Sequence, residues 1–95
     1  MSKRTRRDRQ PANPFHPGEV LLEEFLTPGE MSQAAFAEKL GWTRAKLNEL
    51  IKGKRGVTAD TALDLAAALG TSPRLWMNLQ ATYDLAKAAA KRDAA

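Results

Sequence analysis

Apolar residues recur every three or four positions along most of the chain, and this spacing predicts helices rather than strands. The first predicted helix starts at Pro17, because a missing N–H suits the first helical position, and stops at the Thr-Pro-Gly sequence at 27–29. Two short helices follow: Ser32 caps the first, Gly41 ends it, and Thr43 caps the second. The chain is therefore expected to open with one longer and two short helices.

Two more helices complete the pattern. Thr58 opens the fourth, with apolar residues at i, i+3, i+4 and i+7, and Gly70 closes it. The fifth starts at Ser72-Pro73 and runs to about Lys91 through an alanine-rich stretch of high helix propensity. The expected fold class is all-α, with five helices in one domain over residues 15–92.

Residues 1–14 differ from this pattern. They are charged, lack apolar periodicity and end in Gln-Pro-Ala-Asn-Pro, so we expect a disordered basic arm. The first ten residues hold five basic side chains and one acidic one, which accounts for the whole formal net charge of +4. The rest is neutral but polarised, with a net charge of −4 over residues 11–42 and +4 over residues 43–55. The basic segment can therefore face phosphates while the rest of the surface does not.

The composition excludes several classes of function. At 95 residues the chain has room for one modest core. Without cysteine there is no disulfide or Cys-type zinc site, and His16, the single histidine, is expected at a helix start and cannot build a metal site alone. With no Gly-rich phosphate loop or paired-carboxylate pocket, we expect neither an enzyme nor a cofactor. No apolar run reaches the roughly 18–20 residues of a membrane span, so we expect a cytoplasmic protein without membrane contact.

The stretch from Gln33 to Lys52 meets several constraints of a helix-turn-helix at once. Ala37 is small enough to let the second helix approach the first, and Gly41 tolerates the positive φ that the turn requires. Apolar residues fill the wedge beneath both helices: Phe36, Leu40, Trp42, Leu47 and Leu50. Such a unit holds its second helix against a DNA major groove, N-terminal end first.

Residues of the second short helix and its flanks are therefore assigned to DNA. Arg44 is the strongest candidate base reader, because its planar fork can donate two hydrogen bonds to guanine, and plain phosphate contact is its alternative. Ala45 can touch a thymine methyl, Asn48 can pair with adenine, and Glu49 can accept from cytosine or exclude wrong sequences. The last two can equally be solvated helix surface. The expected phosphate contacts are Gln33, Thr43, Lys46, Lys52, Lys54 and Arg55.

The last predicted helix is longer than this small core can cover. Trp76 is expected to pack on the fourth helix, and an outer row of residues remains, although such residues are on spacing alone more often core than interface. A two-fold contact along this row makes a homodimer and places two recognition helices about one DNA turn apart. The row consists of Leu75, Leu79, Tyr83 and Ala86.

At these residues the chain resembles the Xre/Cro repressor superfamily and, more narrowly, the HigA family of antitoxins. The narrower resemblance rests on HPGEVLLEEFL at 16–26, GKRGVTADTALDLAAALGTSPRLWMNLQATYDL at 53–85 and the helix-turn-helix between them. It covers about residues 15–87, and WMNLQ at 76–80 with YDL at 83–85 is its most distinctive part. It implies a homodimer that binds double-stranded operator DNA of its own operon and neutralises a HigB-type toxin, a ribosome-dependent messenger-RNA endonuclease.

Several alternatives stay open. The chain can be a stand-alone Xre-family transcriptional repressor without a toxin partner, or a protein-interaction module that has lost DNA binding. The arginine-rich start departs from the family pattern and is a DNA-contacting arm, a toxin contact or a segment with neither role. For the toxin surface we expect the acidic first helix with Glu19, Glu23 and Glu24, because a ribosome-directed nuclease is expected to be basic.

Overall fold

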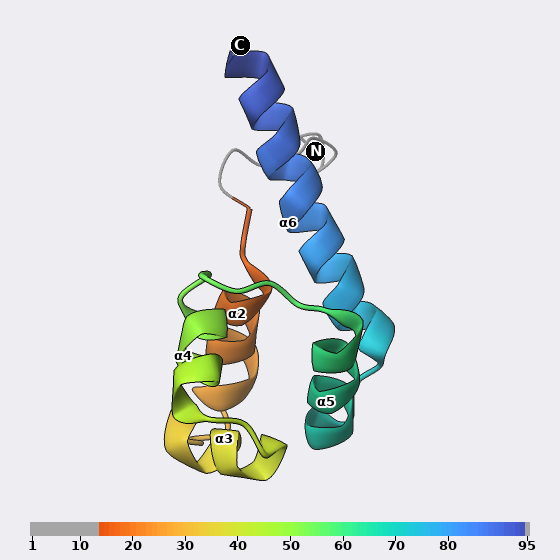
Figure 1. Cartoon of the computed structure of the whole chain (residues 1–95). Coiled ribbons are helices and arrows are strands. Elements are labelled where there is room, and N and C mark those ends of the chain that lie inside the picture. Colours follow the sequence, from red (N-terminus) through yellow and green to blue (C-terminus); the bar gives the residue numbers. More distant parts are fainter. Residues whose placement is uncertain (1–13, 95) are drawn as a thin grey trace.

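The chain is seen in a computed structural model that describes residues 14–94, so the predicted basic arm lies almost entirely outside the described residues. No strand occurs in this part of the chain, and the all-α prediction is confirmed (Figure 1). The first predicted helix consists of two consecutive pieces, and the last runs slightly further than expected. The elements are α2 (Pro17–Val20), η1 (Leu21–Leu26), α3 (Gln33–Leu40), α4 (Arg44–Ile51), α5 (Ala59–Leu69) and α6 (Pro73–Ala94).

The apolar spacing predicted a uniform α-helix for the first helix, and this prediction is wrong. From Leu21 to Leu26 it is a π-helix, and the N–H of Thr27 donates to the carbonyl of Leu22, five residues back, at 2.9 Å. The wider turn brings residues five apart onto the same side. Leu21 and Leu26, which would diverge on an α-helix, are therefore both fully buried in the core.

The helix ends form where the sequence predicts them. The hydroxyls of Ser32, Thr43 and Thr58 each accept a hydrogen bond from a backbone N–H three residues later, at 3.1 to 3.3 Å. Gly41 and Gly70 end α3 and α5 in the left-handed conformation, with φ of 75° and 74°. These five predicted boundary residues are confirmed.

One core joins η1 with helices α3 to α6. Trp76 of α6 is fully buried beside α5, as predicted, and its indole Nε1 donates to Thr71 Oγ1 at 2.8 Å. Its ring also lies 5.5 Å from that of Phe25 in η1, centroid to centroid. The buried residues of the cluster are Leu21, Leu26, Phe36, Ala37, Leu47, Leu50, Val57, Ala62, Leu65 and Trp76.

The backbones of α2 and α4 lie in close contact at Gly18. A Cβ added to Gly18 would lie 1.8 Å from the carbonyl oxygen of Leu50, so only glycine fits here. The preceding His16 caps α2, because its Nδ1 accepts from the N–H of Gly18 at 3.0 Å, and its ring packs edge-on against Tyr83 of α6 at 4.8 Å. The start of α2 therefore holds both α4 and α6 in place.

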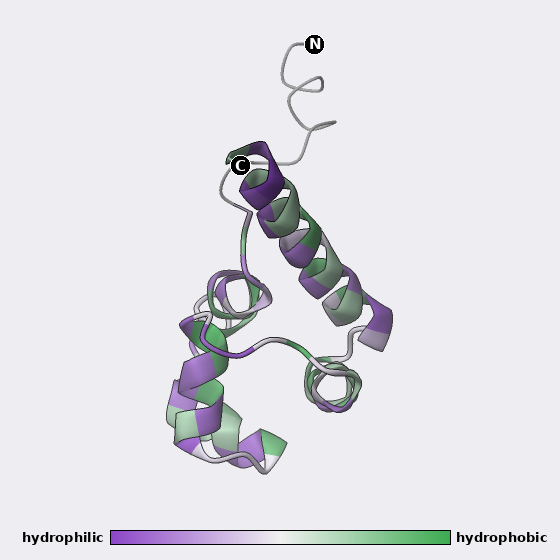
Figure 2. Ribbon diagram, turned by 45° about the horizontal axis from the view of Figure 1, so that its top comes forward, coloured by the Kyte–Doolittle hydropathy of each residue, from purple (hydrophilic) through white to green (hydrophobic). Residues whose placement is uncertain are grey.

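The C-terminal half of α6 extends away from the other helices (Figure 1) and carries hydrophobic as well as hydrophilic residues (Figure 2). Leu85 is 63% exposed on it. Among the described helices, none is long and apolar enough to cross a membrane.

Candidate nucleic-acid interface

The turn between α3 and α4 is closed by hydrogen bonds. Gly41 is in the left-handed conformation, and its N–H donates to the carbonyl of Glu38 at 3.1 Å. The backbone N–H of Trp42 donates to the carbonyl of Ala37 at 2.9 Å. Thr43 then starts α4 by accepting from the N–H of Lys46. Because every residue of this short turn is tied to a neighbouring helix, the N-terminus of α4 has a fixed position relative to α3.

The side chains of α4 divide into an inner and an outer face. Leu47 and Leu50 are fully buried on the inner face, and they pack with Phe36 and Ala37 of α3. The predicted wedge is confirmed, with Leu40 and Trp42 partly buried at its edge. Trp42 also donates from its indole Nε1 to Asp64 Oδ2 of α5 at 3.0 Å. The outer face carries the predicted base readers Arg44, Ala45, Asn48 and Glu49, followed by Lys52.

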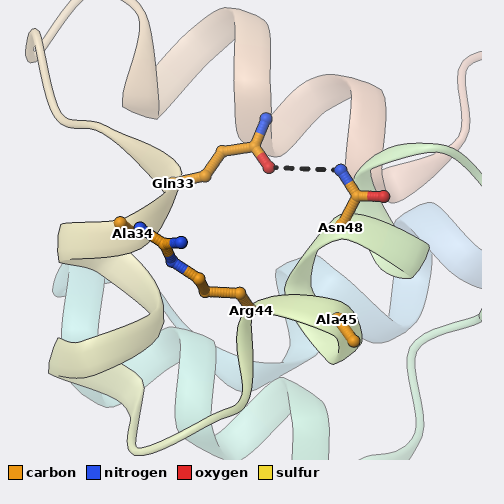
Figure 3. A pocket seen from close by; sticks show the side chains of 5 residues that line it. All are labelled: Gln33, Ala34, Arg44, Ala45 and Asn48. Atoms are coloured by element: carbon orange, nitrogen blue, oxygen red, sulfur yellow. Dashed lines mark hydrogen bonds between the residues drawn. The ribbon is translucent and has the colours of Figure 1, made fainter.

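A hollow lies on one flank of this outer face, between the N-terminal ends of α3 and α4. Figure 3 shows the Arg44 side chain reaching across it toward Ala34, while Gln33 Oε1 accepts from Asn48 Nδ2 at 3.5 Å. Gln33, Arg44, Ala45 and Asn48 were predicted from the sequence and are brought together here. Ala34 was not predicted; its position directly after Gln33 at the start of α3 was the signal available.

The opposite flank carries an ion pair that the sequence did not predict. Arg55, in the loop after α4, donates from Nη2 to Glu49 Oε1 at 2.7 Å and from Nε to the same oxygen at 3.1 Å. The two side chains are 45% and 46% exposed. The predicted base reader Glu49 and the predicted phosphate contact Arg55 thus form one unit.

The remaining predicted phosphate contacts lie around α4. Lys46 Nζ lies 4.2 Å from the centroid of the Trp42 ring, which keeps the cation beside the turn. Thr43 uses its hydroxyl oxygen as a cap but keeps an O–H to donate. Lys52 and Lys54 are exposed at the end of α4 and in the following loop. Of these cations, Lys52 alone continues the row of outer-face residues on α4 itself.

The residues predicted for dimer contact divide into two groups. Leu75 is 37% exposed and, with the partly buried Leu79, lines an apolar groove together with the exposed Phe15. Tyr83 is partly covered, because its ring packs on His16, and Ala86 is 3% exposed within its own chain. Leu75 and Leu79 therefore keep apolar surface accessible, whereas the Ala86 side chain is already covered.

His16 begins the first helix, as predicted, and its chemistry is that of a cap. Burial lowers the pKa of His16, while the carboxylates of Asp84 and Glu19 oppose the shift. The ring is therefore neutral at pH 7, which leaves Nδ1 free to accept from Gly18. Residues 14–94 contain no group of three or more His, Cys, Asp or Glu side chains placed to hold a metal ion.

Comparison with known proteins identifies relatives of this arrangement. Residues 22–76 match the helix-turn-helix family. Virulence-associated protein I of Dichelobacter nodosus is 44% identical over 71 residues, which are 75% of this chain and 66% of that protein. Antitoxin HigA-1 of Vibrio cholerae is 45% identical over 73 residues, which are 76% of this chain and 68% of that protein. The chain thus spans about two thirds of the length of these curated relatives.

A solved structure, the Pseudomonas aeruginosa antitoxin HigA with the higBA promoter, has the same architecture. It superposes with a TM-score of 0.80 at 41% sequence identity, covering 84% of this chain and 87% of that chain. The fold and the helix-turn-helix are therefore shared with a protein whose structure includes promoter DNA.

Proposed function

The chain belongs to the helix-turn-helix family and, within it, to the HigA antitoxins, and from this membership we propose that it represses its own operon and neutralises a toxin encoded beside it. It acts in the bacterial cytoplasm as a binding protein, and no catalytic step is part of the proposal. Its partners are operator DNA, a HigB-type toxin that cleaves messenger RNA, and a second copy of itself.

Operator binding rests on the outer face of α4. Arg44 and Asn48 line the hollow next to α3, at the end of the helix that enters a major groove first. Ala45 between them lets the helix approach base edges closely, and Lys52 and Lys54 are exposed for phosphates. The HigA relative that was solved with promoter DNA supports operator binding by this fold.

A two-fold dimer fits the length of an operator. Leu75 and Leu79 give each copy an exposed apolar strip next to Phe15, and pairing such strips removes them from water. Two copies related by a dyad present two α4 helices about one DNA turn apart. We therefore expect a palindromic operator with one half-site for each copy.

Toxin neutralisation is assigned to the acidic side of α2 and η1. Glu19, Glu23 and Glu24 are all exposed there, on elements that do not belong to the helix-turn-helix. A basic nuclease can bind this surface while α4 remains free for DNA. Reversing these three charges should abolish neutralisation of the adjacent-gene product in co-expression and leave DNA binding unchanged. Neutralisation that survives the reversal would exclude this surface.

A fluorescence-anisotropy titration tests the operator proposal. Labelled duplexes from the DNA upstream of the gene are compared with scrambled duplexes of the same composition at roughly physiological salt. We expect the upstream duplex to bind at least about a thousandfold more tightly. Equal binding of both duplexes, lost on adding salt, would mean that only non-specific charge contacts are present. Specific binding without any neutralised adjacent gene product would instead identify a stand-alone repressor.

A further inference from the structure

Each flank of the outer face of α4 is tied to a residue outside the helix. Gln33 of α3 contacts Asn48 on one flank, and Arg55 of the following loop contacts Glu49 on the other. We infer that Arg55 is a positioning residue that orients Glu49 to read a cytosine, and is not a phosphate contact. The inference rests on the proposed operator binding and adds to it a residue that determines sequence specificity.

The geometry leaves half of the carboxylate free. Both donor nitrogens of Arg55 bind Oε1 of Glu49, at 2.7 and 3.1 Å, and within residues 14–94 Oε2 has no hydrogen-bond partner. Two donors on one oxygen hold Oε1 in place, and this limits the directions in which Oε2 can point. An acceptor held in this way matches the N4 amino group of cytosine in the major groove, and is repelled by the O6 and N7 acceptors of guanine and by O4 of thymine. Adenine also presents an amino donor, N6, but its N7 acceptor lies beside it.

The charges explain why the pair suits this place. An unpaired carboxylate would be repelled by the DNA phosphates, but the Arg55 cation compensates the charge of Glu49. In turn, a cation already paired with a carboxylate contributes little to counterion release on binding DNA. An ion pair exposed to this extent also adds little to folding stability. Its main consequence is therefore the orientation of Glu49.

The test uses the upstream duplex that the wild-type protein binds selectively, together with its complete series of single base-pair substitutions. The variants are Arg55→Ala, Arg55→Lys and Glu49→Gln, and Lys54→Ala is the matched control, since Lys54 is exposed in the same loop and forms no ion pair within the described chain. Each protein is measured for base preference by anisotropy and for the slope of log affinity against log salt.

We expect the wild type to prefer C·G at one position of each half-site by about 5- to 150-fold. Arg55→Ala and Glu49→Gln should both reduce that preference to about threefold or less. A variant that combines these two substitutions should lose no more of the base preference than either single variant, because the two residues act as a unit. Arg55→Lys, which keeps the charge but not the fork, should retain part of the preference. Lys54→Ala should keep the preference in full and reduce the salt slope by about 0.9.

Two results would overturn the inference. One is an Arg55→Ala variant that keeps the base preference and loses about 0.9 of the salt slope, which is the behaviour of a phosphate contact. The other is a Glu49→Gln variant with unchanged base preference. Wild-type protein that binds every duplex equally would overturn operator binding itself, and this is seen before any variant is measured. Unchanged circular dichroism of the variants excludes loss of folding as the cause.

Discussion

The α3–α4 unit and α6 reach their positions by different means. In the α3–α4 unit, Gly41, Trp42 and Thr43 make every turn and cap contact with residues at most five positions away. Helix α6 is instead held by contacts with distant segments. Gln80 Oε1 accepts from the N–H of Val57 at 2.7 Å, and Tyr83 packs on His16. The helix-turn-helix is thus a locally determined unit that the rest of the domain places.

This difference bears on function. A recognition helix must keep its angle to the neighbouring helix, and short-range contacts give it that stiffness. The C-terminal half of α6 extends from the body of the domain (Figure 1), and Leu85 on it is 63% exposed although the neighbouring Ala86 is covered. We therefore expect substitutions in the two regions to differ in whether they affect folding, DNA binding or both.

The largest expected effect tests how α6 is anchored. Trp76→Ala removes the largest fully buried side chain, and the cavity should lower the free energy of unfolding by about 3–5 kcal/mol. Leu85→Ala, further along α6 where the side chain is 63% exposed, is the matched control and should change it by less than about 0.5 kcal/mol. Urea denaturation of both variants measures this. Similar losses at the two positions would mean that α6 is anchored along its whole length.

The difference between short-range and long-range contacts also decides how much of the structure could be predicted from the sequence. The caps at Ser32 and Thr43, the left-handed Gly41 and the wedge beneath α3 and α4 follow from local chemistry, and all were predicted correctly. The predicted readers Arg44 and Asn48 do share one hollow, although their contact with DNA stays a prediction.

The features that were missed depend on distant residues or on geometry that periodicity does not report. Apolar spacing cannot distinguish the π-helix at Leu21–Leu26 from an α-helix. The pairing of Arg55 with Glu49 depends on how the loop after α4 folds back. Ala86 was predicted as part of the dimer row, but spacing does not show that its own chain covers it.

An intermediate effect is expected where the locally determined unit meets the rest of the domain. Gly18→Ala places a methyl group against the Leu50 carbonyl of α4, and relief of this contact requires a backbone shift that should cost about 2–3 kcal/mol. Because α4 must move, specific DNA affinity should also fall when measured well below the melting temperature. Gly41→Ala meets no atom within 4 Å and should cost only about 1–2 kcal/mol, from its left-handed backbone. Thermal denaturation gives both values, and equal costs would mean that α2 and α4 adjust freely to each other.

The smallest effect concerns pH at the junction of α2 and α6. Because burial lowers the pKa of His16 in the folded state, the unfolded chain binds more protons between that lowered pKa and the ordinary value of 6.5. Stability is therefore full above about pH 6.5, falls as the pH drops through this window, and levels off below the folded pKa. Protonation of Nδ1 also removes the acceptor for the N–H of Gly18.

His16→Asn keeps a side-chain acceptor at the cap and should remove this pH dependence, which denaturation curves at pH 5 to 8 can measure. Asp84 and Glu19 remain in that variant, so a slope that persists would assign the pH dependence to carboxylates instead of His16.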